Sequence, residues 1–355
     1  MANASTLLRS LIRPCLMLCI SLSIITICAG RGYSQRYSGE NRPAVEENDF
    51  TRTLPQGKWE NKALDSYPEI DVQLQIQLIK SSFTEDAELA LQLLSHDNAR
   101  VRAKYAHEIW AQLHLAEQQQ EHILWKGRAP LIKQAMENLN HPVPEVRATA
   151  AELLSVFGEE SSPALETLAI LLRDGTTVKE NESAALALLN MGEAAKPAAP
   201  LLMFAALDHM ERRDSVKCAP YCCDALGKLN CAAELKLMYE SGHIVGSMSL
   251  AAMGYLDPVP EFALQELCRR AATGEGALTG LKGLGRVRPT TERIVAAVSE
   301  CYDKSDDRMR FYVAVALEQL EPNAPGLKAL AEKMLKDDDE TVRRTAQEVL
   351  EKIQE

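Results

Sequence analysis

The clearest hydrophobic pattern in the chain lies in residues 141–158, which read HPVPEVRATAAELLSVFG. Val146, Ala150, Leu153, Leu154 and Phe157 recur at offsets of four, three, one and three, which places them on one face of a helix with 3.6 residues per turn. Two prolines precede this pattern and a glycine follows it, as is typical where a helix begins and ends. One such helix cannot bury its apolar stripe alone, so the pattern predicts that similar helices pack against it.

Similar segments recur along the chain, and the last apolar residue of each is called its anchor. Successive anchors lie 44, 34, 38, 27, 31, 33 and 33 residues apart. Residues seven positions before an anchor are mostly small, and residues three positions before it are mostly large, which is typical of stacked helix pairs. The pattern predicts an all-α fold, an α-solenoid of about eight stacked helix pairs over residues 70–355. The anchors of units 1 to 8 are Leu113, Phe157, Met191, Leu229, Leu256, Val287, Leu320 and Ile353.

Each anchored segment is expected to be the second helix of its pair, with a first helix preceding it. No stretch alternates between apolar and polar residues for long enough to predict a strand. The first helices are predicted over residues 86–94, 131–139, 163–172, 197–206, 232–239, 261–272, 292–302 and 326–335.

The N-terminal segment differs from the rest of the chain. Arg9 and Arg13 precede an apolar run at 15–28, and no acidic residue occurs before Glu40. This run of about 14 residues has the length of a signal-peptide core and is shorter than the roughly 20 residues that span a bilayer. We therefore expect residues 1–30 to be a cleaved signal peptide or, alternatively, an N-terminal anchor that tethers the protein to a membrane through residues 14–30. The protein is expected to be exported, to the periplasm or the extracellular space.

Residues 31–69 are polar and weakly patterned, which predicts a flexible linker. The whole chain carries a net charge of −11, and removal of residues 1–30 leaves 37 basic and 50 acidic residues, a net charge of −13. An acidic protein gains nothing from the phosphate attraction that dominates nucleic-acid binding, and an anionic membrane surface would repel it. We expect protein partners, with no nucleic acid and no membrane contact beyond the N-terminal anchor.

Four turns carry a family resemblance. They read DNARVR at 97–102, PEVR at 144–147, DDRMR at 306–310 and DDDETVR at 337–343, and each precedes a second helix rich in alanine and leucine. This pattern resembles HEAT repeats, including the short variety found in bilin-lyase-type proteins, over roughly residues 84–355. The resemblance implies that the second helices line a concave surface, and such surfaces typically hold another protein.

In HEAT repeats the turn Asp and the following Arg bond between neighbouring repeats. Asn181, Ala219 and Ala277 stand where this Arg would be in the middle units. The resemblance therefore implies that the middle junctions are looser or differently angled.

Four cysteines, Cys218, Cys222, Cys223 and Cys231, cluster in unit 4. A metal or redox site, a disulfide and simple core packing are all open interpretations. The register favours packing, because Cys222 occupies the small core position held elsewhere by alanine, and no Cys-x-x-Cys spacing occurs. Cys268 and Cys301 lie on first helices of adjacent units, and the redox state of all six is left open. The alternative to a binding scaffold is a metal- or cofactor-handling enzyme on the same fold, with the cysteine cluster or a bilin-lyase-like site.

The second helices also suggest a binding surface. The position five residues before each anchor points away from the apolar stripe. Because several of these residues are acidic, we expect a surface that is negative at both ends, with Leu186, Ala251 and Val315 as an apolar floor between them. Such a groove would hold a basic or mixed segment of a partner protein. We expect no catalytic residues and no cofactor in it. The alternative interpretation is an ordinary solvated helix face. His107 is expected on a solvated face as well. The eight positions are Glu108, Glu152, Leu186, Asp224, Ala251, Lys282, Val315 and Glu348.

Overall fold

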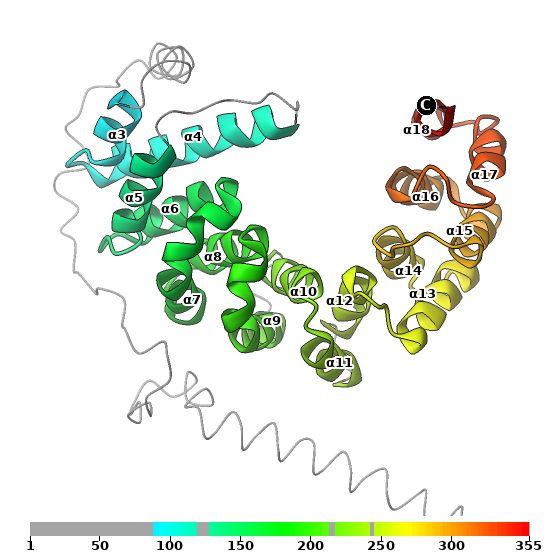
Figure 1. The fold of residues 1–355 in the computed structure, drawn as a ribbon, viewed down its shortest axis with the longest axis horizontal. Helices are drawn as coiled ribbons and strands as arrows, with labels where there is room; N and C mark the ends of the chain where they lie inside the picture. The colour runs from blue at the N-terminus through cyan, green and yellow to red at the C-terminus, as the bar shows by residue number, and fades with distance from the viewer. Residues whose placement is uncertain (1–87, 119–127, 213–216, 242–244, 355) are drawn as a thin grey trace, which may run out of the picture. The chain divides into compact units, whose positions relative to one another are not determined.

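The computed structural model describes residues 88–118, 128–212, 217–241 and 245–354 (Figure 1). The regular structure within these ranges is helical and contains no strand, which confirms the all-α solenoid. The predicted signal peptide at 1–30, the linker at 31–69 and the start of the predicted solenoid up to residue 87 lie outside these ranges. None of the helices in these ranges combines the length and the apolar character needed to cross a bilayer.

The first helices of the eight units overlap all eight predicted ranges. In units 3 and 4 they follow short 3-10 helices, η3 (Gly158–Ala164) and η4 (Gly192–Ala198), and these hold Pro163 and Pro197. The first helices are α3 (Glu88–Leu94), α5 (Arg128–Asn138), α7 (Leu165–Asp174), α9 (Ala199–Arg212), α11 (Ala232–Glu240), α13 (Glu261–Thr273), α15 (Glu292–Lys304) and α17 (Leu327–Met334).

The second helices contain or immediately precede the predicted anchors. In unit 5 a short 3-10 helix, η5 (Met253–Tyr255), extends the second helix. The second helices are α4 (Ala99–Gln118), α6 (Pro144–Val156), α8 (Val178–Asn190), α10 (Cys218–Lys228), α12 (Val245–Ala252), α14 (Ala277–Leu284), α16 (Asp307–Gln319) and α18 (Glu340–Gln354).

The helices form two rows. Each second helix contacts the next from α4 to α18, and the first helices contact one another from α3 to α5, from α7 to α11 and from α13 to α17. The core lies between the rows, as the periodicity predicts. The small residues seven positions before the anchors are all buried, and so are the large residues three positions before them except the half-buried Trp110.

Local sequence explains where several helices begin and end. Gly158 follows the C-cap of α6 with a φ of +54°, a left-handed conformation that glycine adopts without a steric penalty. Thr177 caps α8, where its hydroxyl accepts a hydrogen bond from the backbone N–H of Glu180 in a capping box. Asp306 caps α16 in the same way by accepting from the N–H of Met309.

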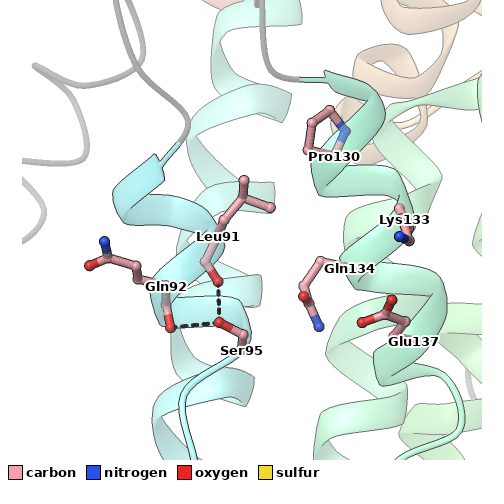
Figure 2. Close-up of a pocket in the computed structure, with 7 residues that line it drawn as sticks. All are labelled: Leu91, Gln92, Ser95, Pro130, Lys133, Gln134 and Glu137. Atoms are coloured by element: carbon pink, nitrogen blue, oxygen red, sulfur yellow. Dashed lines mark hydrogen bonds between the residues drawn. The ribbon is translucent and has the colours of Figure 1, made fainter.

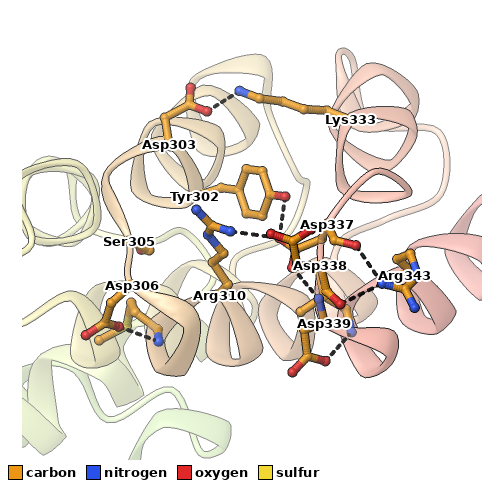
Figure 3. Close-up of polar contacts among 12 residues, drawn as sticks. Tyr302, Asp303, Ser305, Asp306, Arg310, Lys333, Asp337, Asp338, Asp339 and Arg343 are labelled. Atoms are coloured by element: carbon orange, nitrogen blue, oxygen red, sulfur yellow. Dashed lines mark hydrogen bonds and ion pairs between the residues drawn. The ribbon is translucent and has the colours of Figure 1, made fainter.

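The arginines of the outer units bond across unit junctions. Arg147 of unit 2 lies 2.7 Å from Glu180 of unit 3, and both side chains are almost fully buried. Arg310 of unit 7 lies 3.5 Å from Asp337 of unit 8 (Figure 3). The expected bonds between neighbouring units are therefore present. Arg147, however, bonds to Glu180 in the first turn of α8 and not to a residue of the turn that precedes α8.

A second network, made of hydrogen bonds, orders the turn that precedes α18. The Tyr302 hydroxyl donates to Asp337 Oδ2 at 2.5 Å, while Arg343 donates to the carbonyl oxygens of Asp337 and Asp338 (Figure 3). Burial raises the pKa of Tyr302 to about 12, and its hydrogen bond to Asp337 adds to this shift. Burial opposes ionisation of Asp337, but the bonds from Tyr302 and the Asp339 N–H outweigh it and lower the pKa of Asp337.

Units 4, 5 and 6 are joined by close backbone approach, so the expectation of looser junctions is wrong for these units, while the expectation of a different angle stays a prediction. A Cβ added to Gly227 in unit 4 would lie 2.4 Å from the Ala252 carbonyl oxygen of unit 5. A Cβ added to Gly254 in unit 5 would lie 2.3 Å from the Gly283 oxygen of unit 6. These helices therefore approach each other more closely than a residue with a Cβ at either glycine position would allow.

Candidate protein-binding surface

The second-helix face is the side of the second helices that carries the positions five and nine residues before each anchor. At 100° per residue these positions lie roughly opposite the anchor and the core positions three and seven residues before it. The structure places all the predicted positions on second helices, but their exposure differs greatly. Lys282, Val315 and Glu348 are exposed, Glu108, Leu186 and Asp224 are half-buried, and Glu152 and Ala251 are buried.

Glu152 is a junction residue rather than an exposed charge, which corrects its predicted place on an open surface. Its carboxylate lies 2.8 Å from Nδ1 of His107 in unit 1 and 2.6 Å from Nζ of Lys179 in unit 3. The Glu152 side chain is only 5% exposed, because both neighbours cover it. His107 is half exposed, as expected for a solvated face, yet it also binds this carboxylate and stacks on Trp110.

Asp224 is likewise bound within the chain. Arg286 of unit 6 donates to both of its carboxylate oxygens, at 2.8 and 2.7 Å. The guanidinium also lies over the ring of Tyr255 of unit 5, 4.4 Å from its centroid. Ala251 of unit 5 is buried, so it cannot form part of the apolar floor that the sequence predicted.

Glu348 of α18, and Glu318 on the preceding second helix α16, have partners too. Glu348 lies 3.7 Å from Arg344, and Glu318 lies 3.8 Å from Lys352. These pairs are solvent-exposed and contribute little to stability, but together with the pairs of Glu152 and Asp224 they offset much of the negative charge. The second-helix face is therefore less acidic than a count of its carboxylates indicates.

Exposed apolar side chains gather in units 6 and 7. Leu278 is 46% exposed, Phe311 44% and Val315 40%. Leu278 and Phe311 both lie nine residues before their anchors, on the contacting helices α14 and α16. We call Leu278, Phe311 and Val315 the apolar patch. Of these three residues the sequence pattern predicts only Val315, because Leu278 and Phe311 lie nine rather than five residues before their anchors.

The cysteines are packed in the helices. All six described cysteines are buried, and the sulfurs of Cys218 and Cys222 lie 3.9 Å apart. Burial raises the pKa of both Cys222 and Cys223, and raises that of Cys231 to about 11, so these thiols stay protonated near neutral pH. Over residues 88–118, 128–212, 217–241 and 245–354 no three His, Cys, Asp or Glu residues are arranged to hold a metal ion.

A pocket of about 330 Å³ lies on the other row, between α3 and α5 (Figure 2). Its walls include Leu91, Ser95 and Pro130, and the Ser95 hydroxyl donates to the backbone oxygen of Leu91. Lys133 and Glu137 are the charged side chains that line it, one turn apart on α5. The pocket offers no cluster of titratable groups that would support chemistry.

Neither a family model nor a curated protein matches this chain. Among solved structures, an engineered protein from a structural genomics consortium is 15% identical over 75% of this chain and 78% of its own, with a TM-score of 0.39. A designed armadillo repeat protein is 13% identical over 76% of this chain and 100% of its own, with a TM-score of 0.33. Similarities this low carry no argument about function. The eight helix pairs themselves show that the chain is a helical repeat protein, while membership of the HEAT family stays a prediction.

Proposed function

We propose that this protein is a repeat scaffold that binds a protein partner on its second-helix face, through the apolar patch. The observation that carries the proposal is the exposure of Leu278, Phe311 and Val315 on two contacting helices. Single exposed apolar side chains are ordinary, but several large ones on neighbouring helices are more typical of an interaction site. Large apolar side chains at the centre of an interface commonly supply most of its binding free energy.

The packing of α16 holds Phe311 and Val315 in place. Val313, Ala314, Ala316 and Leu317 of α16 are buried, so the helix cannot rotate to hide Phe311 or Val315 without exposing its own core. A preorganised surface loses little conformational entropy when a partner binds. The patch therefore suits a binding role better than a folding role.

The proposal includes export and the absence of catalysis. Residues 1–30 would direct the chain out of the cytoplasm, and residues 31–69 would separate the solenoid from the membrane if the signal acts as an anchor. The thiols are buried and protonated, which disfavours the cysteine-based alternative as an enzyme.

The test places a photo-crosslinking residue at Lys282, which is exposed on the second-helix face of unit 6, and recovers crosslinked proteins from source cells. The variant carries Leu278→Ser, Phe311→Ser and Val315→Ser. Its matched control carries serine at three other large apolar positions that are exposed within the described residues, Val178, Leu237 and Phe262, which lie off the patch. Circular dichroism and the unfolding midpoint of both variants establish that they fold.

We expect one protein to crosslink near stoichiometry, to be lost in the patch variant and to be retained in the control. Equal recovery from both folded variants would show that the patch is not the binding site. Loss in the control alone would move the site to the surfaces around Val178, Leu237 and Phe262, and recovery of no crosslinked protein would also contradict the proposal.

A further inference from the structure

We propose that the solenoid contains a hinge between units 5 and 6, and that the ion pair of Asp224 with Arg286 is a strap that sets its angle. The strap holds units 4 and 6 together on the second-helix face. When it breaks, units 6 to 8 turn about the junction between units 5 and 6, which widens this face and brings the first helices α11 and α13 together. The inference goes beyond the proposed function, because it concerns the angle of the repeat array and not the partner that binds to it.

The first-helix row is interrupted at this junction. Within the described residues, α7, α9 and α11 pack in one series and α13, α15 and α17 in another, without comparable contact between α11 and α13. These two helices meet through the rings of Tyr239 and Phe262, whose centroids lie 6.0 Å apart. α13 also contacts α12, where Arg270 donates to the Ser247 hydroxyl at 3.1 Å. The similar interruption between α5 and α7 is filled by η3, which contacts both helices. The first helices therefore restrain the angle between units 5 and 6 less than they do within each series.

The second helices at the junction meet backbone against backbone, as a pivot requires. A Cβ added to Gly254 of η5 would lie 2.3 Å from the Gly283 oxygen of α14, so no side chain lies between the two backbones at this point. Helices that pack through ridges and grooves of side chains resist rotation, and this contact lacks such ridges. α12 and α14 have eight residues each, which is about 12 Å of length and gives them little leverage against bending.

The junctions on either side of the hinge are tied by hydrogen bonds. Asn230 of unit 4 and Asp257 of unit 5 exchange two of them, at 3.1 and 3.2 Å. Arg288 of unit 6 donates to the Gln319 carbonyl oxygen of unit 7 at 2.6 Å. Units 4 and 5 therefore move as one body and units 6 and 7 as another, so that bending concentrates at the junction between them.

The strap crosses the hinge on one side only. Arg286 donates to both carboxylate oxygens of Asp224, at 2.8 and 2.7 Å, and such bidentate pairs fix orientation as well as distance. Asp224 lies five residues before its anchor, on the second-helix face, whereas the first helices lie on the other side of the second helices. The pair therefore prevents units 4 and 6 from separating on this face. Because its side chains are only 9% and 20% exposed, salt screens it only in part.

An apolar contact on the other side gives the hinge its direction. Phe262 of α13 is 39% exposed and Tyr239 of α11 is half-buried, although their rings are in contact. Closer approach of α11 and α13 would remove more of this apolar surface from water, which is favourable. The strap opposes that movement, because the movement would separate Asp224 from Arg286. Loss of the strap should therefore close the first-helix row and open the second-helix face.

Distances between pairs of spin labels, measured by pulsed electron paramagnetic resonance on the full chain, test the inference. The labels are attached to a genetically encoded ketone residue, so that the cysteines stay unmodified. The first pair, at Val178 and Gln347, spans the second helices from unit 3 to unit 8. The second pair, at Lys236 and Gln265, joins α11 to α13. The third pair, at Ala296 and Gln347, lies within units 7 and 8, and all five positions are exposed.

Two variants break the strap. Arg286→Ala removes the guanidinium, and Asp224→Asn removes the carboxylate but leaves Arg286 over the Tyr255 ring. The matched control is Arg293→Ala, which removes another arginine ion pair, that with Glu261, on one side of the hinge. The free energy of unfolding of each variant establishes that it folds.

We expect both strap variants to lengthen the mean distance of the first label pair and to shorten that of the second, each by more than about 2 Å. The third distance should not change, and the Arg293→Ala control should leave all three distances unchanged. Unchanged first and second distances in the folded Asp224→Asn variant would overturn the proposal. A change of the same size within units 7 and 8 would also overturn it, because the movement would then not be confined to the hinge.

Discussion

The guanidinium of Arg286 binds both carboxylate oxygens of Asp224 although the two residues lie 62 positions apart. Asp224 belongs to unit 4 and Arg286 to unit 6, so the pair spans unit 5, whose Tyr255 ring lies beneath the guanidinium. This pair links alternate units, so the stability of the middle of the solenoid depends in part on a contact between two side chains.

Removal of Arg286 should destabilise the chain appreciably. The Arg286 side chain is 9% exposed and that of Asp224 20%, so Arg286→Ala leaves a carboxylate in a poorly solvated place. We expect a loss of about 2–3 kcal/mol in the free energy of unfolding, measured by urea denaturation. Lys352→Ala removes one partner of an exposed pair and should cost less than about 0.5 kcal/mol. Equal losses in the two variants would show that the Asp224 pair does not stabilise the fold.

Gly254→Ala should disrupt the junction between units 5 and 6. The new methyl group would meet the Gly283 backbone oxygen at 2.3 Å, and a backbone oxygen cannot move without shifting its helix. We expect a cost of about 2–3 kcal/mol in thermal or urea unfolding. In Gly283→Ala the methyl group meets the side chain of Leu267, which can change rotamer, so this control should cost less. The reverse order would contradict the close backbone approach.

Phe157→Ala should be among the most damaging substitutions in unit 2. Phe157 is 4% exposed and its ring also contacts the Arg128 guanidinium, so its removal leaves a cavity. The expected loss is about 3–5 kcal/mol. Glu108→Ala, at a half-buried position of the second-helix face, should change stability by less than about 0.5 kcal/mol. Similar values for both would refute the register of the helices.

Tyr302→Phe should change how stability depends on alkaline pH. Burial and the bond to Asp337 raise the pKa of Tyr302 from an ordinary value near 10 to about 12. A group with a raised folded pKa contributes stability that is fully present below its unfolded pKa and is lost as the pH rises through its folded pKa. The natural chain should therefore lose more stability between pH 10 and 12 than the Phe variant, measured as the difference in urea midpoints at each pH. Parallel pH profiles would show that the hydroxyl is not buried against Asp337.

Asp337 should determine part of how stability depends on acidic pH. Its pKa is lowered in the folded chain, so its contribution is present above its unfolded pKa near 4 and is lost as the pH falls below that value. Asp337→Asn should flatten the acid limb of the stability profile below about pH 4, and leave the slope between pH 5 and 7 unchanged. A change in slope confined to neutral pH would assign the titration to another group.

The repeat and its register could be predicted from the sequence alone. Burial of an apolar stripe requires residues at fixed offsets, so the period of small and large positions already identified the eight helix pairs and the core residues from Ala106 to Leu350. Helix ends were predictable for the same local reason, because glycine and the capping residues act within one turn.

The candidate site depended on tertiary structure. The sequence predicts that Glu152 points away from the core, but it contains no signal that His107 and Lys179 cover that carboxylate from the units on either side. Nor does it show that Arg286 crosses a whole unit to reach Asp224, because such a contact depends on how closely Gly227 and Gly254 let their helices approach. Periodicity determines which face of a helix each residue occupies, whereas the distance and tilt between helices decide which charges are neutralised and which apolar side chains, such as Leu278 and Phe311, stay exposed.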